Sequence, residues 1–236
     1  MQALAINIGA NTTLPGFRGP IDASGSFVYV PIPEREPTKT TVPTYADLDL
    51  PITIPAEHRD TPVHLDPTFA SYSCCTNYTY GDEHGVKASQ IAKLTAGDRL
   101  YFYATLTSTP DDHPDWMPPR WGAYVIGHFT LDADPVEDAH EHGLSRHDRE
   151  KFRDNAHCKR ETLDARVLVS GDATQSHLYD RAIPLSAPTA GRDAGPLITD
   201  YSHDSGAGPW WRRPIWFSEP DRIIERVLAH NETIRS

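Results

Sequence analysis

The chain has 236 residues, of which 38% are apolar, and its mean hydropathy is −0.52. This composition predicts a soluble protein with a full hydrophobic core and excludes a membrane-spanning one, since no apolar run approaches roughly 18 residues. The first residues form too short an apolar stretch for a signal peptide and lack its basic flank. With no long linker in the sequence, we expect a single cytoplasmic domain over residues 1–236.

The charged residues are strongly biased. The net charge is −11, with 22 Asp against 11 Glu and 17 Arg against five Lys. Such an acidic, arginine-rich composition is typical of halophile-like, salt-adapted proteins, although a GC-rich genome produces the same bias. Because salt-adapted proteins are acidic outside their contact faces, this acidity does not exclude a nucleic-acid partner. Three cysteines, two of them adjacent, do not make a disulfide framework.

Strand patterns come first along the chain and helix patterns later. In chain order we predict strands at residues 3–8 and 27–33, an extended covering segment at 34–67, a helix at 87–94, strands at 98–106 and 121–131, a helix at 145–157, a strand at 162–170 and a helix from 218 onward. Prolines end the second strand and recur through the covering segment. This order predicts an α+β fold with a mixed curved sheet, flanking helices and long ordered loops.

The two strands at 98–106 and 121–131 carry the clearest signal. A Gly97-Asp98 turn leads into a strand dense in aromatic and β-branched residues, and a second such strand follows a loop rich in Pro and Asp. We expect the two strands to be neighbours in one sheet. This pattern resembles the small barrels of the PUA-like superfamily, with its EVE and ASCH branches, and those barrels bind nucleotides and modified bases.

A glycine-containing loop at 7–20 follows the first strand. Gly9, Gly16 and Gly19 would allow backbone N–H groups to approach a ligand closely, and Arg18 offers a bidentate guanidinium for phosphate. The loop lacks the Gly-Lys-Ser/Thr ending of a P-loop. A turn-rich connection between two strands is the alternative interpretation.

Basic residues recur at steps of three and four through the predicted helix at 145–157. They are Arg146, Arg149, Arg153, His157 and Arg160. This spacing predicts one helical face that could follow a phosphate backbone, with Asn155 and His157 available for a base edge or for proton transfer. The alternative is a solvated face paired with Asp148, Glu150 and Asp154.

Aromatic residues and arginines alternate near the end of the chain, at 208–217, as in a stacking platform for bases. Core tryptophans are the alternative interpretation of this stretch.

The nearest approach to a metal-ligand motif is His140-Glu141-His142, and because zinc needs three or four convergent ligands we expect no metal site there. The common hydrolase, zincin and dinucleotide fingerprints are absent from the sequence.

Several stretches together resemble a known family. They are Asn7-Ile-Gly-Ala-Asn-Thr-Thr-Leu-Pro-Gly-Phe-Arg-Gly-Pro20, the run from Gly25 to Glu34, His64-Leu-Asp-Pro67, Thr79-Tyr-Gly-Asp82, the Gly97-Asp98 strand and Asn155-Ala-His157. These stretches resemble the nucleotide modification associated domain, third type. The resemblance implies a barrel related to PUA-like domains and a DNA base modification enzyme or its companion, without naming a reaction or a cofactor.

The resemblance and the residue types together name the candidate site. The candidate proton carriers are Glu34, His64, Asp66 and His157; the candidate substrate-binding residues are Asn11 and Arg18 for phosphate or sugar, Tyr80, Tyr103 and Trp210 for stacking, and Asn155, Arg153 and Arg160 for a base edge and phosphates. The partner would be DNA or a free nucleotide. A base inside a duplex cannot be reached, so a base in DNA would have to flip out of the helix to react.

Two other functions stay open at this point. The same pocket in a non-catalytic reader would bind a modified base in DNA or RNA without reaction, and a scaffold protein would use the aromatic C-terminal stretch as a dimer surface. An enzyme needs acid, imidazole and amide groups in one pocket, which a reader does not. We therefore expect Asn11, Glu34, Asp66 and His157 to lie together if the protein is an enzyme. We also expect the loop at 7–19 to face the same cleft as His64, Asp66 and Tyr80.

Overall fold

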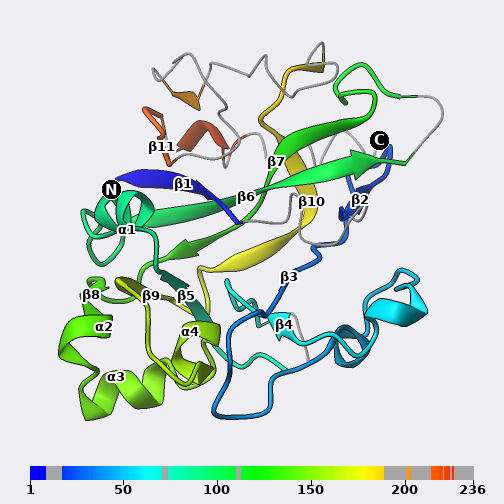
Figure 1. Ribbon diagram of the computed structural model, residues 1–236. Coiled ribbons are helices and arrows are strands. Elements are labelled where there is room, and N and C mark those ends of the chain that lie inside the picture. The colour runs from blue at the N-terminus through cyan, green and yellow to red at the C-terminus, as the bar shows by residue number, and fades with distance from the viewer. Residues whose placement is uncertain are drawn as a thin grey trace. The chain divides into compact units, whose positions relative to one another are not determined.

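A computed structural model describes most of the chain (Figure 1). The described residues are 1–8, 18–70, 74–109, 113–188, 201–202, 214–219, 221–223 and 225. The chain divides into two compact units, each built from separate stretches: the first from 1–30, 100–128 and 178–236, the second from 31–99 and 129–177. The expectation of a single domain over 1–236 stays a prediction.

The first unit is built on a six-stranded sheet. Its strands in spatial order are β10 (His177–Pro184), β7 (Trp121–Thr130), β6 (Arg99–Ser108), β1 (Ala3–Asn7) and β11 (Ile215–Trp216), with β2 (Pro20–Ile21) paired in parallel to β6. The long strands β6 and β7 are rich in aromatic and β-branched residues, which suit a half-buried pleated surface.

The strand pair predicted from the sequence is confirmed, because β6 and β7 are neighbours in this sheet. Backbone hydrogen bonds mark both ends of the pair, from Ser108 N to the Arg120 carbonyl and from Leu131 N to the Asp98 carbonyl, each 2.9 Å long. The α+β class is confirmed as well. The sheet is open within the described residues, however, with β10 and the two-residue β11 at its ends, so a closed barrel is not observed there.

One buried cluster of the first unit lies on one face of this sheet, and residues of the opposite face, such as Phe102 and Tyr124, are buried as well. Tyr101 and Tyr103 on β6 alternate with residues of the opposite face, and Ala123 and Val125 do the same on β7. The buried cluster is completed by Ala3, Ala5, Ile183, Leu185, Tyr201, Ile215, Phe217 and Ile223. Ile223, in the stretch predicted as a helix from 218 onward, belongs to this core.

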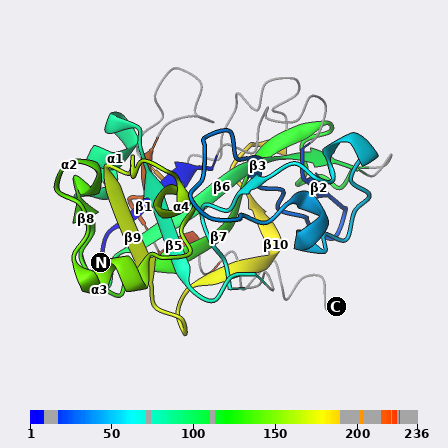
Figure 2. The ribbon, with the colours of Figure 1, turned by 60° about the horizontal axis from the view of Figure 1, so that its bottom comes forward.

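The second unit contains two small antiparallel sheets (Figure 2). One has the strand order β5 (Tyr78–Asp82), β9 (Val167–Gly171), β8 (Val136–Glu137), and the other pairs β3 (Ile32–Pro33) with β4 (Val63–His64). The helices are α1 (Gly85–Ile91), α2 (Ala139–His142), α3 (Arg146–Lys151) and α4 (Ala156–Lys159), with 3-10 turns η1 (Tyr45–Leu48) and η2 (Ala56–His58) in the covering segment. No described helix is long and apolar enough to span a membrane.

The prediction of one helix at 145–157 is wrong. Ser145 caps the start of α3, because the Ser145 hydroxyl accepts a hydrogen bond from Asp148 N at 3.1 Å. The helix ends at Lys151, Phe152 packs into a small core with Leu168, and Asn155 adopts an extended backbone that begins α4. An asparagine side chain that caps a new helix competes with continuation of the previous one, which explains the break.

Candidate functional site

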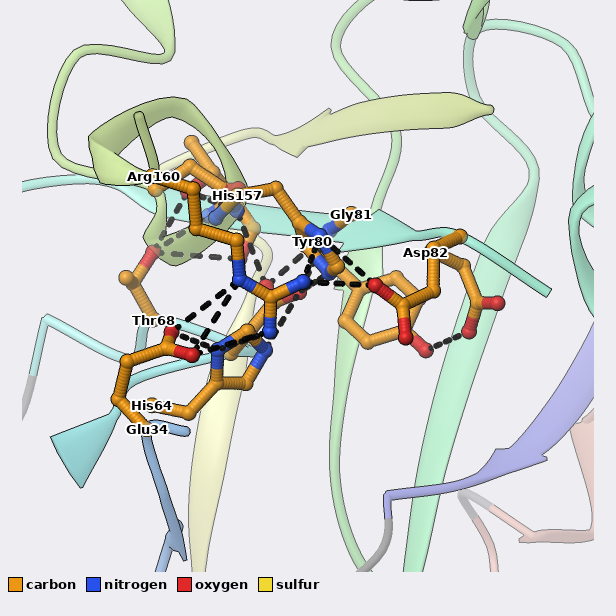
Figure 3. Close-up of polar contacts among 12 residues, drawn as sticks. Glu34, His64, Thr68, Tyr80, Gly81, Asp82, His157 and Arg160 are labelled. Atoms are coloured by element: carbon orange, nitrogen blue, oxygen red, sulfur yellow. Dashed lines mark hydrogen bonds and ion pairs between the residues drawn. The ribbon is translucent and has the colours of Figure 1, made fainter. Parts of the chain in front are cut away.

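Five segments of the second unit bring polar side chains together in one buried cluster (Figure 3). Pairing of β3 with β4, with Ile32 opposite His64, brings Glu34 close to the His64 imidazole. Asp66 follows β4, Gly81 lies on β5, and α4 with its flanks carries Asn155, His157 and Arg160. Glu83 and Asp164 complete the group. The ion cluster, as we call it, consists of eight side chains, to which Gly81 adds a backbone N–H: Glu34, His64, Asp66, Glu83, Asn155, His157, Arg160 and Asp164.

His64 is oriented by Glu34. The His64 Nδ1 atom lies 2.6 Å from Glu34 Oε2, and Glu34 Oε1 accepts hydrogen bonds from the backbone N–H groups of Arg35 and Glu36, both at 3.0 Å. Burial raises the pKa of the Glu34 carboxyl, but the hydrogen bond and charge of His64, with the other donors, outweigh it and lower that pKa to about 2. An ionised Glu34 only accepts, so His64 Nδ1 carries the proton and its Nε2 is the atom that faces Asp66.

His157 is oriented in the same way by a second carboxylate. Its Nδ1 atom lies 2.7 Å from Asp164 Oδ1, and its Nε2 atom lies 3.3 Å from Asp66 Oδ2. Burial lowers the pKa of His157, but the hydrogen bonds and charges of Asp164 and Asp66 outweigh it and raise that pKa to about 10. The two imidazole rings lie edge to face, with centroids 5.0 Å apart. Two carboxylate–imidazole pairs therefore converge on one carboxylate.

Asp66 is held in place by amide donors. Asn155 Nδ2 donates to Asp66 Oδ1 at 3.0 Å, and the Gly81 backbone N–H lies 3.1 and 3.0 Å from the two carboxylate oxygens. The Asn155 carbonyl oxygen also accepts from His157 N at 3.1 Å, which caps α4. A Cβ at Gly81 would lie 2.8 Å from His157 Cδ2 and 2.9 Å from Leu168 Cδ2, so the close approach requires glycine.

Arg160 joins three carboxylates of the ion cluster. Its guanidinium donates to Glu34 Oε1 at 3.1 Å, to Glu83 Oε2 at 2.6 Å and, at shorter range, to Asp164. Burial lowers the pKa of Arg160, but the hydrogen bonds and charges of Asp164 and Glu34 outweigh it and raise that pKa. Burial raises the pKa of Asp164, but the hydrogen bond and charge of His157, with the hydrogen bond of Arg160, outweigh it and lower that pKa. The side chains of Glu83 and Asp164 are 39% and 30% exposed, so the cluster reaches solvent on this side.

All four residues predicted as proton carriers thus lie in one cluster, together with Asn155 and Arg160 from the predicted substrate-binding set. Their catalytic and binding roles stay predictions. Glu83, Asp164 and Gly81 were missed as site residues. For Asp164 a signal was available, because it follows Arg160 by four positions and His157 by seven in a chain segment dense in basic residues.

The other predicted substrate-binding residues lie elsewhere or outside the described part. Tyr80 is buried, and its hydroxyl donates to Asp82 Oδ2 at 2.5 Å, where Lys87 also binds at 2.7 Å. Tyr103 belongs to the core of the first unit. Arg18, also in the first unit, lies over the Trp121 ring at 4.8 Å, and burial lowers its pKa. Asn11, Trp210 and most of the loop at 7–19 lie outside the described residues.

The prediction of one basic face on the helix at 145–157 is wrong, since the helical period is interrupted between α3 and α4. On the exposed side, Arg149 donates to the Leu144 carbonyl at 2.6 Å, and Arg153 pairs with Glu150 at 3.1 Å and with Asp154 at 3.5 Å. His157 and Arg160 are instead buried in the ion cluster. For Arg153 this matches the alternative of a solvated, acid-paired face.

A polar pocket of about 680 Å³ lies in the second unit beside the ion cluster. Its lining includes Tyr78, Thr79, Asp132, Glu150, Lys151 and Arg153. Thr79 connects the two features, because its hydroxyl lies 3.3 Å from the Asn155 amide nitrogen that binds Asp66. The pocket has the size of an ordinary small-molecule site.

Comparison with known proteins gives one family and one distant structure. No curated protein gives a significant match. Among solved structures, the N-terminal domain of Thermococcus gammatolerans McrB bound to m5C DNA aligns over 97% of this chain and 99% of that one, at 15% identity. Its TM-score of 0.34 is too low to carry an argument, so the PUA-like likeness stays a prediction.

The family comparison is more extensive. The family model described as nucleotide modification associated domain 3 matches residues 2–233, which is nearly the whole chain. The resemblance drawn from the sequence motifs is therefore confirmed, and the chain belongs to the nucleotide modification associated domain 3 family.

Proposed function

We propose that this protein is an enzyme that modifies a base or nucleotide, in DNA or free, and that the ion cluster is its reaction centre. The observation that carries the proposal is the convergence of Glu34, His64, Asp66 and His157 in one buried cluster, with Arg160 reaching Glu34 across 126 positions of sequence. Membership of a family named for nucleotide modification supports the substrate class.

The organisation of the cluster favours catalysis over reading. Each imidazole is oriented at Nδ1 by its own carboxylate, and each presents Nε2 to Asp66. Such pairs are the usual arrangement for proton transfer, whereas recognition of a base needs no paired imidazoles. Buried charges are also a costly way to stabilise a fold, because well-packed apolar residues of similar volume often do as well or better. A reaction centre accounts for that cost.

The adjoining pocket supports a nucleotide-sized substrate. Tyr78 offers an aromatic ring, and Lys151 and Arg153 offer positive charge for phosphate, all in the pocket lining. Thr79 belongs to this lining and its hydroxyl lies 3.3 Å from the amide nitrogen of Asn155, so a single residue separates the pocket from the cluster. A base from duplex DNA would enter the pocket only after flipping out of the helix.

The test compares nucleosides from cells by mass spectrometry. DNA and the free nucleotide pool are analysed from cells that lack the gene and from cells complemented with wild type, Asp66→Asn, or the exposed control His142→Gln. We expect a modified nucleoside that disappears with the gene and returns with wild type and the control, but not with Asp66→Asn. Full return with Asp66→Asn would contradict a reaction centre at this cluster.

The reader alternative has its own signature in the same experiment. A reader leaves the nucleoside profile unchanged when its gene is removed. The purified protein would then retain selective binding to modified DNA, and Asp66→Asn would change that selectivity without changing any nucleoside level. That pair of results would replace the enzyme proposal by the reader function.

A further inference from the structure

The two imidazoles of the ion cluster direct their Nε2 atoms toward the same carboxylate oxygen. Asp66 Oδ2 lies 3.3 Å from His157 Nε2 and 3.9 Å from His64 Nε2. Metal–ligand bonds of about 2.1 Å at tetrahedral or octahedral angles place neighbouring ligand atoms about 3.0 to 3.4 Å apart. The His157 distance already fits that range, and a small turn of the His64 ring would bring its nitrogen into it.

We infer that His64 Nε2, His157 Nε2 and the Asp66 carboxylate form a binding site for one divalent first-row transition-metal ion. The three ligand atoms lie within 4.8 Å of one another, and all three residues are buried. Three protein ligands leave coordination positions open for water or a substrate, as in catalytic metal sites. Glu83 and Asp164 are the members of the cluster whose side chains are partly exposed, on the side where the cluster meets solvent.

The surroundings of each ligand are those that metal sites use. A ligating histidine commonly donates its other ring N–H to a carboxylate, which fixes the tautomer and increases the basicity of the ligating nitrogen. Glu34 does this for His64 at 2.6 Å, and Asp164 does it for His157 at 2.7 Å. The third ligand, Asp66, is fixed by Asn155 and by the Gly81 backbone N–H. The outer contacts are therefore in place for all three ligands.

The position of Arg160 separates this site from a neighbouring group of possible ligands. Glu83, His157 and Asp164 also approach one another, but the Arg160 guanidinium binds both carboxylates of that group. It lies 3.3 Å from the Nδ1 atoms of both His64 and His157, on the side of the rings away from their Nε2 atoms. One cation therefore occupies the Nδ1 side, and the Nε2 side faces Asp66.

The charge of the cluster favours a second cation. The cluster contains four carboxylates, those of Glu34, Asp66, Glu83 and Asp164, and one guanidinium, that of Arg160, which binds all of them except Asp66. Metal binding would displace the proton from His157 Nε2. With both imidazoles then neutral, the four carboxylates and Arg160 leave three negative charges in a mostly buried group, which a divalent ion would reduce to one. Two imidazole nitrogens with one carboxylate suit Zn²⁺ or Fe²⁺, whereas Ca²⁺ and Mg²⁺ prefer all-oxygen sites.

This inference concerns the same cluster as the proposed function and deepens it. A bound metal would turn His64 and His157 from proton carriers into ligands. The two proposals can fail separately, because metal binding is measured on the purified protein without substrate, and the proposed function is measured by nucleosides from cells. Metal binding without any change in nucleosides would contradict only the proposed function. A change in nucleosides without metal binding by the purified protein would contradict only the metal site.

The test titrates the full-length protein, stripped with a chelator, with Co²⁺ and Zn²⁺. We expect one ion per chain by calorimetry, visible d–d absorption from bound Co²⁺, and a thermal unfolding midpoint that rises with metal concentration. Asp66→Asn and His157→Gln should lose most of the affinity. Glu34→Gln, which removes the carboxylate charge that His64 Nδ1 faces, should weaken binding by about 10- to 100-fold.

The matched control is the double variant His140→Gln/His142→Gln, which removes the His-x-His motif of α2. It should bind the metal as tightly as wild type. Equal affinity in wild type and Asp66→Asn, or no binding by wild type, would overturn the site. If Asp66→Asn fails to fold, X-ray absorption of the Zn²⁺-loaded wild type decides: two imidazole ligands with oxygen support the site, and sulfur ligation or fewer than two imidazoles overturns it.

Discussion

Arg153 and Arg160 are seven positions apart and were predicted on one helical face, yet their environments differ completely. The Arg153 side chain is 59% exposed and pairs with Glu150 and Asp154 through solvent-accessible contacts. The Arg160 side chain is 10% exposed and binds Glu34, Glu83 and Asp164. A solvent-exposed ion pair contributes little to the free energy of unfolding. Removal of one member of a buried network is costly, because it leaves the remaining charges buried without a partner. The same residue type should therefore matter little for stability at position 153, after the end of α3, and much at position 160, at the end of α4.

Replacement of Arg160 should give the largest effect. Arg160→Ala leaves the carboxylates of Glu34 and Asp164 without their guanidinium, and we expect a loss of about 3–5 kcal/mol in the free energy of unfolding. Urea unfolding followed by circular dichroism measures this loss. Arg160→Lys should recover only part of the stability, because one ammonium cannot serve three carboxylates in the same geometry. A loss below that of Arg153→Ala would contradict the buried network.

The two helix-capping residues provide the second comparison. Asn155→Ala removes the cap of α4, worth about 1 kcal/mol, and also leaves Asp66 Oδ1 with only the Gly81 backbone N–H as a donor, which should cost about 1–3 kcal/mol more. Ser145→Ala removes only the exposed cap of α3 and should cost about 0.5–2 kcal/mol. The same unfolding measurement ranks the two variants. Equal losses would mean that the contact with Asp66 adds no stability.

Gly81 and Gly85 provide a third comparison. They are close in sequence, but an added Cβ would be crowded at Gly81 and would have open space at Gly85. A methyl group at Gly81 would collide with His157 and Leu168, so Gly81→Ala should cost about 1–3 kcal/mol through overpacking. At Gly85 no atom lies within 4 Å of the added Cβ, and Gly85→Ala should be neutral or stabilise by up to about 1 kcal/mol. Thermal unfolding of both variants checks the difference. A tolerated alanine at Gly81 would contradict the close packing of His157 against β5.

The smallest effect concerns the exposed arginine. Arg153→Ala should change stability by only about 0–1 kcal/mol at low salt, and that change should vanish in 1 M NaCl, where the Debye length is about 3 Å. The loss from Arg160→Ala should persist at the same salt concentration because its partners are largely shielded from ions. Unfolding curves at two salt concentrations separate the cases. If the stability change from Arg153→Ala were the same at both salt concentrations, Arg153 would belong to a network that the described contacts do not include.

The sequence alone was sufficient for the class of fold and the family. The aromatic and β-branched content of the segments at 98–106 and 121–131 predicted the pair that became β6 and β7, because strand propensity is a local property. Short motifs spread over the chain were enough to indicate the family. Residue chemistry also selected Glu34, His64, Asp66 and His157 as candidates, since carboxyl and imidazole groups serve in proton transfer.

Tertiary structure decided which of these candidates meet. The path of the chain brings Arg160 to Glu34 across 126 positions, and no local pattern encodes such a contact. The break between α3 and α4 depends on burial of Phe152 and on the side chain of Asn155, so a regular helical period predicted the wrong face for Arg160. Tyr103, chosen for stacking, became core because its strand buries that face. Periodicity reports local conformation, whereas the identity of a side chain's neighbours depends on strand register and loop path, which only the folded chain fixes.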